Sequence, residues 1–259
     1  MNKKLQALKY ILFDFFAAAI AWALFFRFRK LYLEPSKFGY DVPLVIDESF
    51  IYGLLFIPTG WILLYASTGF YKNPYRKSRL IELSQTATVS ILGCTLLFFV
   101  FILDDEINTY KDYYLSYLYI LFFHFVITYL FRFILTSRTV YRIQNREIGF
   151  NTIMIGSNEK AVKLYLEMDG EKKSFGNKFI GFARVNKKDE YLLKDHLPFL
   201  GNSSELKKII LENEIEEAII AIESSEHKSL ENIIGELEGL NVIIKVIPDM
   251  YDILSGSVK

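Results

Sequence analysis

The sequence contains little of what most catalytic and metal sites require. Among its 259 residues there are one cysteine and three histidines. The single thiol, Cys94, excludes an intramolecular disulfide and a cysteine-based zinc site, and it lies in an apolar run where a small buried side chain is expected. The G-x-S-x-G, H-E-x-x-H and P-loop patterns are also absent from the sequence. We therefore expect no catalytic residue and no metal site within this chain.

Charge of one sign is not concentrated in any dense cluster. Lysine plus arginine and aspartate plus glutamate each number 30. Nucleic-acid binding needs clustered basic residues, so nucleic acid is excluded as a partner. The charge is nevertheless uneven, because residues 1–148 hold a basic excess and residues 149–259 an acidic one. This shift predicts two regions in different surroundings, with a boundary at residues 148 and 149.

Charged residues are almost missing from four long stretches of the first region. Crossing about 30 Å of hydrocarbon takes roughly 20 apolar residues in a helix. The stretches that meet this requirement are residues 10–26, 50–70, 84–103 and 113–131. The last three contain no Asp, Glu, Lys or Arg, and a buried helix of a soluble protein seldom reaches this length without a polar face. The pattern predicts an all-α, multi-pass four-helix bundle in the lipid bilayer.

The loops between these stretches predict the orientation, since cytoplasmic loops carry an excess of Lys and Arg. The N-terminus, the loop after the second stretch and the segment after the fourth are basic, whereas the loop after the third is acidic. Both termini are therefore predicted to face the cytoplasm. The exception is the first outer loop, whose basic residues are Arg27, Arg29, Lys30 and Lys37.

Two ionisable residues lie inside the predicted spans. A carboxylate in hydrocarbon is costly and is a functional candidate by default. Asp14 is near the cytoplasmic end, where access to headgroup water or to a basic partner such as Arg76 or Arg132 favours a structural role. His124 fits either a proton relay or a hydrogen bond between helices, and the second is favoured. Basic residues after the fourth span fit either contact with anionic lipid or topology determination; they are Arg132, Arg138, Arg142 and Arg146.

After residue 148 short apolar strands alternate with helices. Strands are predicted at residues 151–156, 178–184, 197–201, 217–222 and 242–247, with helices at 159–168, 202–213 and 226–239. Asn202 and Glu205 have the spacing of a capping box at the start of the second helix. The alternation predicts βαβ units, and hence a cytoplasmic α/β Rossmann-like domain with a mainly parallel sheet.

The first strand–helix turn is the candidate ligand site of this domain. Gly156, Ser157 and Asn158 stand where a doubly wound fold binds phosphates at a helix N-terminus. The dinucleotide fingerprint needs further glycines, and here only the first is present. Arg184 stands at the end of the second strand in place of an acidic residue that would hold a ribose. A phosphorylated ligand and a ligand-free scaffold both fit, so no cofactor is assigned.

The order of parts and four motifs resemble the N-terminal portion of bacterial polyprenyl-phosphate (undecaprenyl-phosphate) glycosyl-1-phosphate transferases, the membrane sugar transferases of exopolysaccharide, capsule and O-antigen biosynthesis. The motifs are Asp14; Gly69-Phe70-Tyr71 with Arg76 and Glu82; residues 153–157 (IMIGS) with 179–182 (FIGF) and 200–201 (LG); and residues 244–259 (IKVIPDMYDILSGSVK). The resemblance covers nearly the whole chain, and the last motif is the most specific.

The resemblance implies a CoA-binding-like Rossmann domain on a four-helix bundle in the bacterial inner membrane, and association as a homodimer. In that family a further C-terminal domain uses Mg²⁺ and an acidic pair to pass a hexose 1-phosphate from a UDP-sugar to undecaprenyl phosphate. That domain would begin where this sequence stops. The chain is therefore expected to be a non-catalytic regulatory or scaffold portion.

Two other interpretations stay open. Membrane-bound nucleotide-sugar 4,6-dehydratases are similar over the same region and continue into a second NAD-binding domain. A free-standing membrane sensor would use a ligand at the Gly156–Asn158 turn to change the packing of the helices. The residues encoded after Lys259 would separate these alternatives.

Overall fold

The computed structural model describes residues 2–102, 110–185, 191–222 and 227–246. The chain divides into two compact units, Met1–Tyr141 and Arg142–Lys259. The first is the helical unit and the second is the α/β unit. This division falls near the end of a long helix, a few residues before the boundary predicted from the change in composition.

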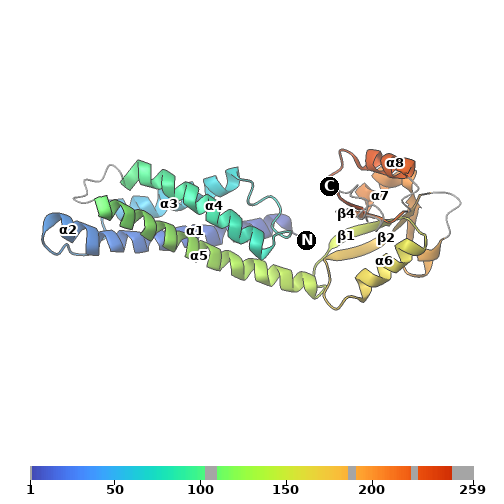
Figure 1. Ribbon diagram of the computed structural model, residues 1–259, viewed down its shortest axis with the longest axis horizontal. Coiled ribbons are helices and arrows are strands. Elements are labelled where there is room, and N and C mark those ends of the chain that lie inside the picture. Colours follow the sequence, from blue (N-terminus) through green and yellow to red (C-terminus); the bar gives the residue numbers. More distant parts are fainter. Residues whose placement is uncertain (1, 103–109, 186–190, 223–226, 247–259) are drawn as a thin grey trace. The chain divides into compact units, whose positions relative to one another are not determined.

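The helical unit consists of four long helices that run alongside one another (Figure 1). Their bounds are α1 (Lys3–Phe28), α3 (Glu48–Ser67), α4 (Arg79–Leu97) and α5 (Tyr110–Gln144). Shorter helical segments follow α1 and α4: η1 (Arg29–Leu33), α2 (Glu34–Phe38) and η2 (Phe98–Ile102). By length and composition, four helical stretches are apolar enough to cross a membrane: Lys3–Phe38, Glu48–Ser67, Arg79–Val100 and Tyr110–Gln144.

Small polar residues at the first turns explain where three of these helices begin. Asn2, Asp47 and Ser78 each accept a hydrogen bond from a backbone N–H of the first turn of α1, α3 and α4, at 3.0, 2.9 and 3.2 Å. Such caps satisfy donors that have no partner inside the helix. The sequence therefore sets the starts of these helices locally.

Two of the helical stretches extend beyond the C-terminal ends of the predicted spans. The first predicted span ends at residue 26, but helical structure continues through Arg29 and Lys30. Lys30 pairs there with Glu34 and Asp47, at 3.0 and 3.2 Å. The fourth predicted span ends at residue 131, but α5 continues to Gln144. In each place a basic residue beyond the predicted span has an acidic partner: Glu34 and Asp47 for Lys30, and Asp14 for Arg132.

The α/β unit is built on a five-stranded parallel sheet of order β3-β2-β1-β4-β5. The strands are β1 (Phe150–Ile155), β2 (Asn177–Arg184), β3 (Phe199–Asn202), β4 (Glu217–Ile220) and β5 (Ile243–Val246). The α-helices are α6 (Glu159–Gly170), α7 (Leu206–Glu212) and α8 (His227–Leu237), and the short 3₁₀ turns are η3 (Leu192–Asp195) and η4 (Ser203–Glu205). The prediction of an α/β fold with a parallel sheet is confirmed.

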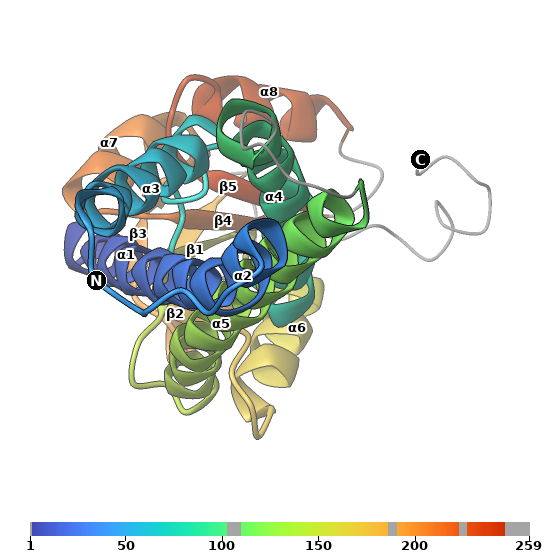
Figure 2. The ribbon, with the colours of Figure 1, turned by 90° about the vertical axis from the view of Figure 1, so that its left-hand side faces the viewer.

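Helices cover both faces of this sheet, with α6 on one face and α7 and α8 on the other (Figure 2). Two apolar clusters fill these layers. Met154, Ala161 and Phe182 belong to the cluster on the α6 side, and Ile153, Ile209 and Ile233 to the cluster on the α7 and α8 side. Alternate residues of β1 point to opposite faces, which is why the strand reads as a continuous apolar run.

Candidate functional site

The turn after β1 is the site that the sequence pattern singled out. The backbone N–H of Gly156 donates a hydrogen bond to the carbonyl of Ala183 at the end of β2, at 2.9 Å. Gly156 has φ +120°, and a Cβ at this position would lie 2.3 Å from the carbonyl oxygen of Ala221, after β4. Only glycine fits, because the chain leaves the sheet against the backbone of a neighbouring strand. This glycine therefore has a packing requirement that is independent of any ligand.

Ser157 and Asn158 complete the turn. Ser157 is buried. Asn158 caps α6, since its Oδ1 accepts a hydrogen bond from the N–H of Ala161 at 3.0 Å. The structure thus brings the three predicted residues together at the carboxyl edge of β1. The Asn158 side chain is used for helix capping, so the features left for a phosphate are the backbone and the N-terminus of α6.

Arg184 lies at the same edge of the sheet, as the last residue of β2. Its Nη2 donates to Oδ1 of Asn202 at 3.3 Å. Its guanidinium group lies over the ring of Tyr191, 4.6 Å from the ring centroid. The carboxyl edge of the sheet therefore offers a tight glycine turn, a helix N-terminus and a cationic side chain on adjacent strands.

A second concentration of polar groups lies inside the helical unit, around Asp14. Arg132 Nε and Nη2 donate to the two carboxylate oxygens of Asp14, each at 2.7 Å, and both side chains are almost fully buried. Arg132 Nη1 also donates to the hydroxyl of Thr86 at 2.9 Å. Of the two basic partners expected for Asp14, the structure shows Arg132. Arg132 is therefore an interior residue, so contact with anionic lipid, one of the two interpretations left open for the basic residues after the fourth span, does not apply to it.

The loop between α3 and α4 adds to this cluster. The hydroxyl of Tyr71 donates to Asp14 Oδ2 at 2.7 Å. Lys77 Nζ lies 3.7 Å from Oε1 of the buried Glu82, and burial lowers the pKa of Lys77 to about 7. Burial and the nearby carboxylate of Asp14 raise the pKa of Tyr71, which keeps its hydroxyl a donor. This loop is thus held to the helices by polar contacts that the helix interior shields from water.

Glu82 is the second acidic residue of this cluster. It accepts a hydrogen bond from Thr136, whose hydroxyl also lies 2.7 Å from that of Tyr10. Sequence reasoning noted Glu82 only as part of a motif and did not identify Thr86 or Thr136. Both threonines stand four residues from a charged member of the cluster, Glu82 or Arg132. This helical spacing was the available signal.

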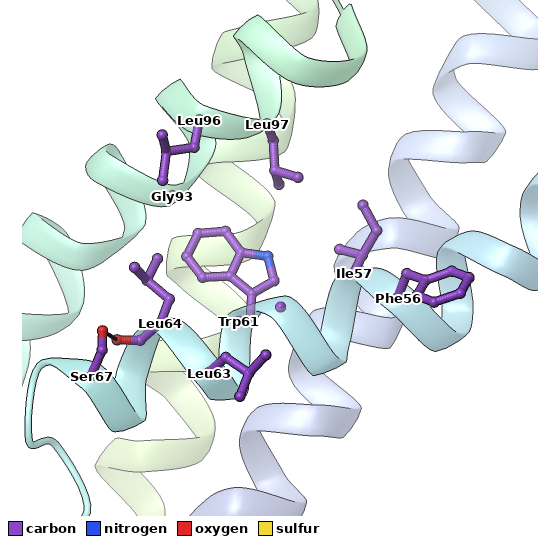
Figure 3. A pocket seen from close by; sticks show the side chains of 10 residues that line it. Phe56, Ile57, Trp61, Leu63, Leu64, Ser67, Gly93, Leu96 and Leu97 are labelled. Carbon is purple, nitrogen blue, oxygen red and sulfur yellow. Dashed lines mark hydrogen bonds between the residues drawn. The ribbon is translucent and has the colours of Figure 1, made fainter.

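His124 and Trp61 connect the interior of the helical unit to its surface. The Nε2 atom of His124 lies 3.2 Å from the hydroxyl of Tyr65, as expected for a hydrogen bond between helices. The His124 ring stacks on Trp61 with 3.6 Å between centroids. Trp61 also lines an apolar groove of about 460 Å³ between α3 and α4 (Figure 3). Ile57, Leu64 and Leu97 are among the other residues that line the groove.

The parallel sheet, the glycine turn after β1 and the helix layers on both faces define an α/β domain of the Rossmann-like class. The family model described as "CoA-binding domain" matches residues 66–248. The chain therefore belongs to this family. The match begins in α3 and includes α4 and α5 as well as the sheet, so it covers parts of both units.

Comparison with solved structures gives only remote similarity. A Rex-family repressor, RSP, is 14% identical with a TM-score of 0.29, and the match covers 49% of this chain and 65% of the repressor. The complex of RSP with beta-NADH is 12% identical with a TM-score of 0.30, and that match covers 68% of this chain and 91% of the repressor chain. TM-scores this low support no inference about function. No curated protein matches the chain.

Proposed function

We propose that the helical unit spans a membrane. Its charged and apolar side chains are distributed differently from those of a soluble protein. Asp14, Glu82 and Arg132 are almost fully buried, whereas large apolar side chains on all four long helices are exposed. The exposed group includes Leu12, Phe16, Leu55, Leu63, Ile91, Leu96, Leu118 and Phe122. Lipid chains cover apolar side chains without penalty, and charged groups in a membrane face the bundle interior.

Fractionation tests this proposal. After lysis without detergent and ultracentrifugation, the full chain is expected in the pellet, and it should stay there after an alkaline carbonate wash. Release into the supernatant under either condition would remove the basis for a membrane location.

For the orientation, we propose that both termini face the cytoplasm of a bacterial inner membrane. Lys and Arg are still more numerous on the cytoplasmic side when Arg132, which is buried, is left out of the count. The basic residues of the first outer loop, Arg27, Arg29, Lys30 and Lys37, still count against this orientation, but they are fewer than those on the cytoplasmic side. Reporter fusions after residue 148 and within residues 40–46 test the topology, with cytoplasmic and outer signals expected respectively.

For the whole protein, we propose the N-terminal membrane and regulatory portion of a sugar transferase. The parent protein would pass a hexose 1-phosphate from a UDP-sugar to undecaprenyl phosphate during surface polysaccharide synthesis. The observation that carries this proposal is one chain that joins four long apolar helices to a domain of the CoA-binding family. The transferase chemistry, with its Mg²⁺, is assigned to a further domain outside these residues.

The expected activity of this chain follows from that assignment. Purified residues 1–259 in detergent should release no UMP from a UDP-sugar and undecaprenyl phosphate, whereas the parent protein with its following domain should release it. UMP release by residues 1–259 alone would place catalysis within this chain and overturn the division of roles.

For the α/β domain we propose nucleotide binding, with the phosphates at the turn formed by Gly156, Ser157 and Asn158. Family membership and the N-terminus of α6 at the carboxyl edge of β1 support this role. Isothermal titration of the detergent-purified chain with CoA, dephospho-CoA, NAD⁺ and NADP⁺ tests it. Saturable binding of at least one of them is expected, and an absence of binding by all of them would leave a ligand-free scaffold.

A further inference from the structure

Arg184 and the glycine turn leave the sheet side by side. The hydrogen bond from the Gly156 N–H to the Ala183 carbonyl fixes the two chain segments against each other, one residue before Arg184. Both lie at the carboxyl edge of the half-sheet formed by β1, β2 and β3. In doubly wound folds this half-sheet holds one nucleotide, with phosphates at the end of β1 and ribose at the end of β2.

Among the described residues, two neighbours hold the guanidinium group of Arg184 in place, and neither carries a negative charge. Asn202 takes one of its five N–H donors, and Tyr191 supports one face of the group. Its Nε is buried without a hydrogen-bond partner, and no carboxylate pairs with Arg184 in the part of the chain that the structure describes. An ordered cation with unused donors at this edge is suited to an anionic group.

The residue type at the end of β2 determines which ribose fits. A carboxylate there accepts hydrogen bonds from an unmodified ribose, whereas an arginine accommodates a phosphate on it. We infer that the α/β domain selects a nucleotide whose ribose carries a phosphate ester, which Arg184 binds, over the same nucleotide with a free ribose. This inference rests on the proposed nucleotide binding at the Gly156 turn.

Two kinds of nucleotide carry such a phosphate. It lies on the 2′ oxygen in NADP⁺ and on the 3′ oxygen in CoA, and the same guanidinium fork suits both. The pairs NADP⁺ with NAD⁺ and CoA with dephospho-CoA each differ only by this phosphate. Titration of the full chain in detergent with both pairs therefore measures the effect of the phosphate and identifies its source.

In at least one pair the phosphorylated member is expected to bind about tenfold or more tightly, the size of a hydrogen bond to a charged group. The preference should decrease as the salt concentration rises, because it arises from charge. Arg184→Gln should abolish it while leaving the affinity for the unphosphorylated member unchanged. Arg184→Lys should retain part of it, because lysine keeps the charge but lacks the planar fork.

Arg142→Gln is the matched control, since Arg142 lies in α5, eight residues before β1 begins, and pairs with Glu147. It should leave the preference intact. Equal affinities within both pairs in the wild-type chain, a preference that persists in Arg184→Gln, or a preference unaffected by salt would each overturn the inference while nucleotide binding itself stands. Failure of all four nucleotides to bind would overturn both. The salt dependence requires no variant, so its absence can overturn the inference even if Arg184→Gln fails to fold, and Arg184→Lys then tests the residue itself.

Discussion

Asp14 and Arg132 each depend on the other for burial inside the helical unit. Removing one partner of a buried, hydrogen-bonded pair leaves an uncompensated charge and costs about 3–5 kcal/mol. We expect Asp14→Ala to lower the free energy of unfolding by about this amount, as measured by denaturant titration in mixed micelles. An unchanged free energy of unfolding would show that the pair does not form.

Two controls accompany Asp14→Ala: a double variant that removes both charges, and a variant that removes an exposed ion pair. Asp14→Ala combined with Arg132→Met should be less destabilised than Asp14→Ala alone, because no unpaired charge remains in the interior. Lys163→Ala removes the exposed pair with Glu167 on α6 and should change the free energy of unfolding by less than about 0.5 kcal/mol.

Gly156 provides a test at the turn after β1. A Cβ there would lie 2.3 Å from the Ala221 carbonyl oxygen, and φ is +120°. Gly156→Ala should therefore destabilise the α/β unit by about 2 kcal/mol or more, through overpacking and backbone strain. Amide hydrogen exchange of β1 and β4 measures this, and Gly170→Ala is the control because nothing lies within 4 Å of its Cβ position. Equal protection in the two variants would contradict the close approach.

At the scale of elements, the close packing of α4 against Trp61 of α3 requires a glycine at position 93. A Cβ on Gly93 would lie 2.3 Å from the ring of Trp61, and the same ring stacks on His124. Gly93→Ala should cost about 1–3 kcal/mol through overpacking and shift the tryptophan fluorescence. Gly60→Ala is the control, since Gly60 lies in the same groove with nothing within 4 Å. No difference between the two variants would rule out this contact.

The elements themselves were largely predictable. Continuous apolar runs identified the four long helices, and short apolar runs between polar helices identified the strands, because both patterns reflect local burial. Asn202 and Glu205 form the predicted capping box. The ends of α1 and α5 were not predictable. Both helices continue past their apolar runs, and only contacts made in the fold compensate the basic residues there.

At the scale of the whole molecule, the α/β unit should fold without the helices. Apolar clusters on both faces of its sheet are formed from its own residues. We expect residues 149–259 expressed alone to be soluble, with helix and strand signals in circular dichroism. Residues 142–259 should be somewhat more stable, because Arg146 Nη1 pairs with Asp169 at 2.9 Å. Precipitation of both fragments in all buffers would show that the unit requires the helices.

The sequence by itself determined the two-part organisation, the long apolar helices and the alternation of strands and helices. Each of these depends on the hydrophobic period of residues that are neighbours in the chain. Only the tertiary structure decided that Asp14 pairs with Arg132, which is 118 positions away, and that Gly156 is required by the backbone of Ala221. Such contacts join segments far apart in sequence, and the hydrophobic pattern of a single sequence does not record which distant side chains meet.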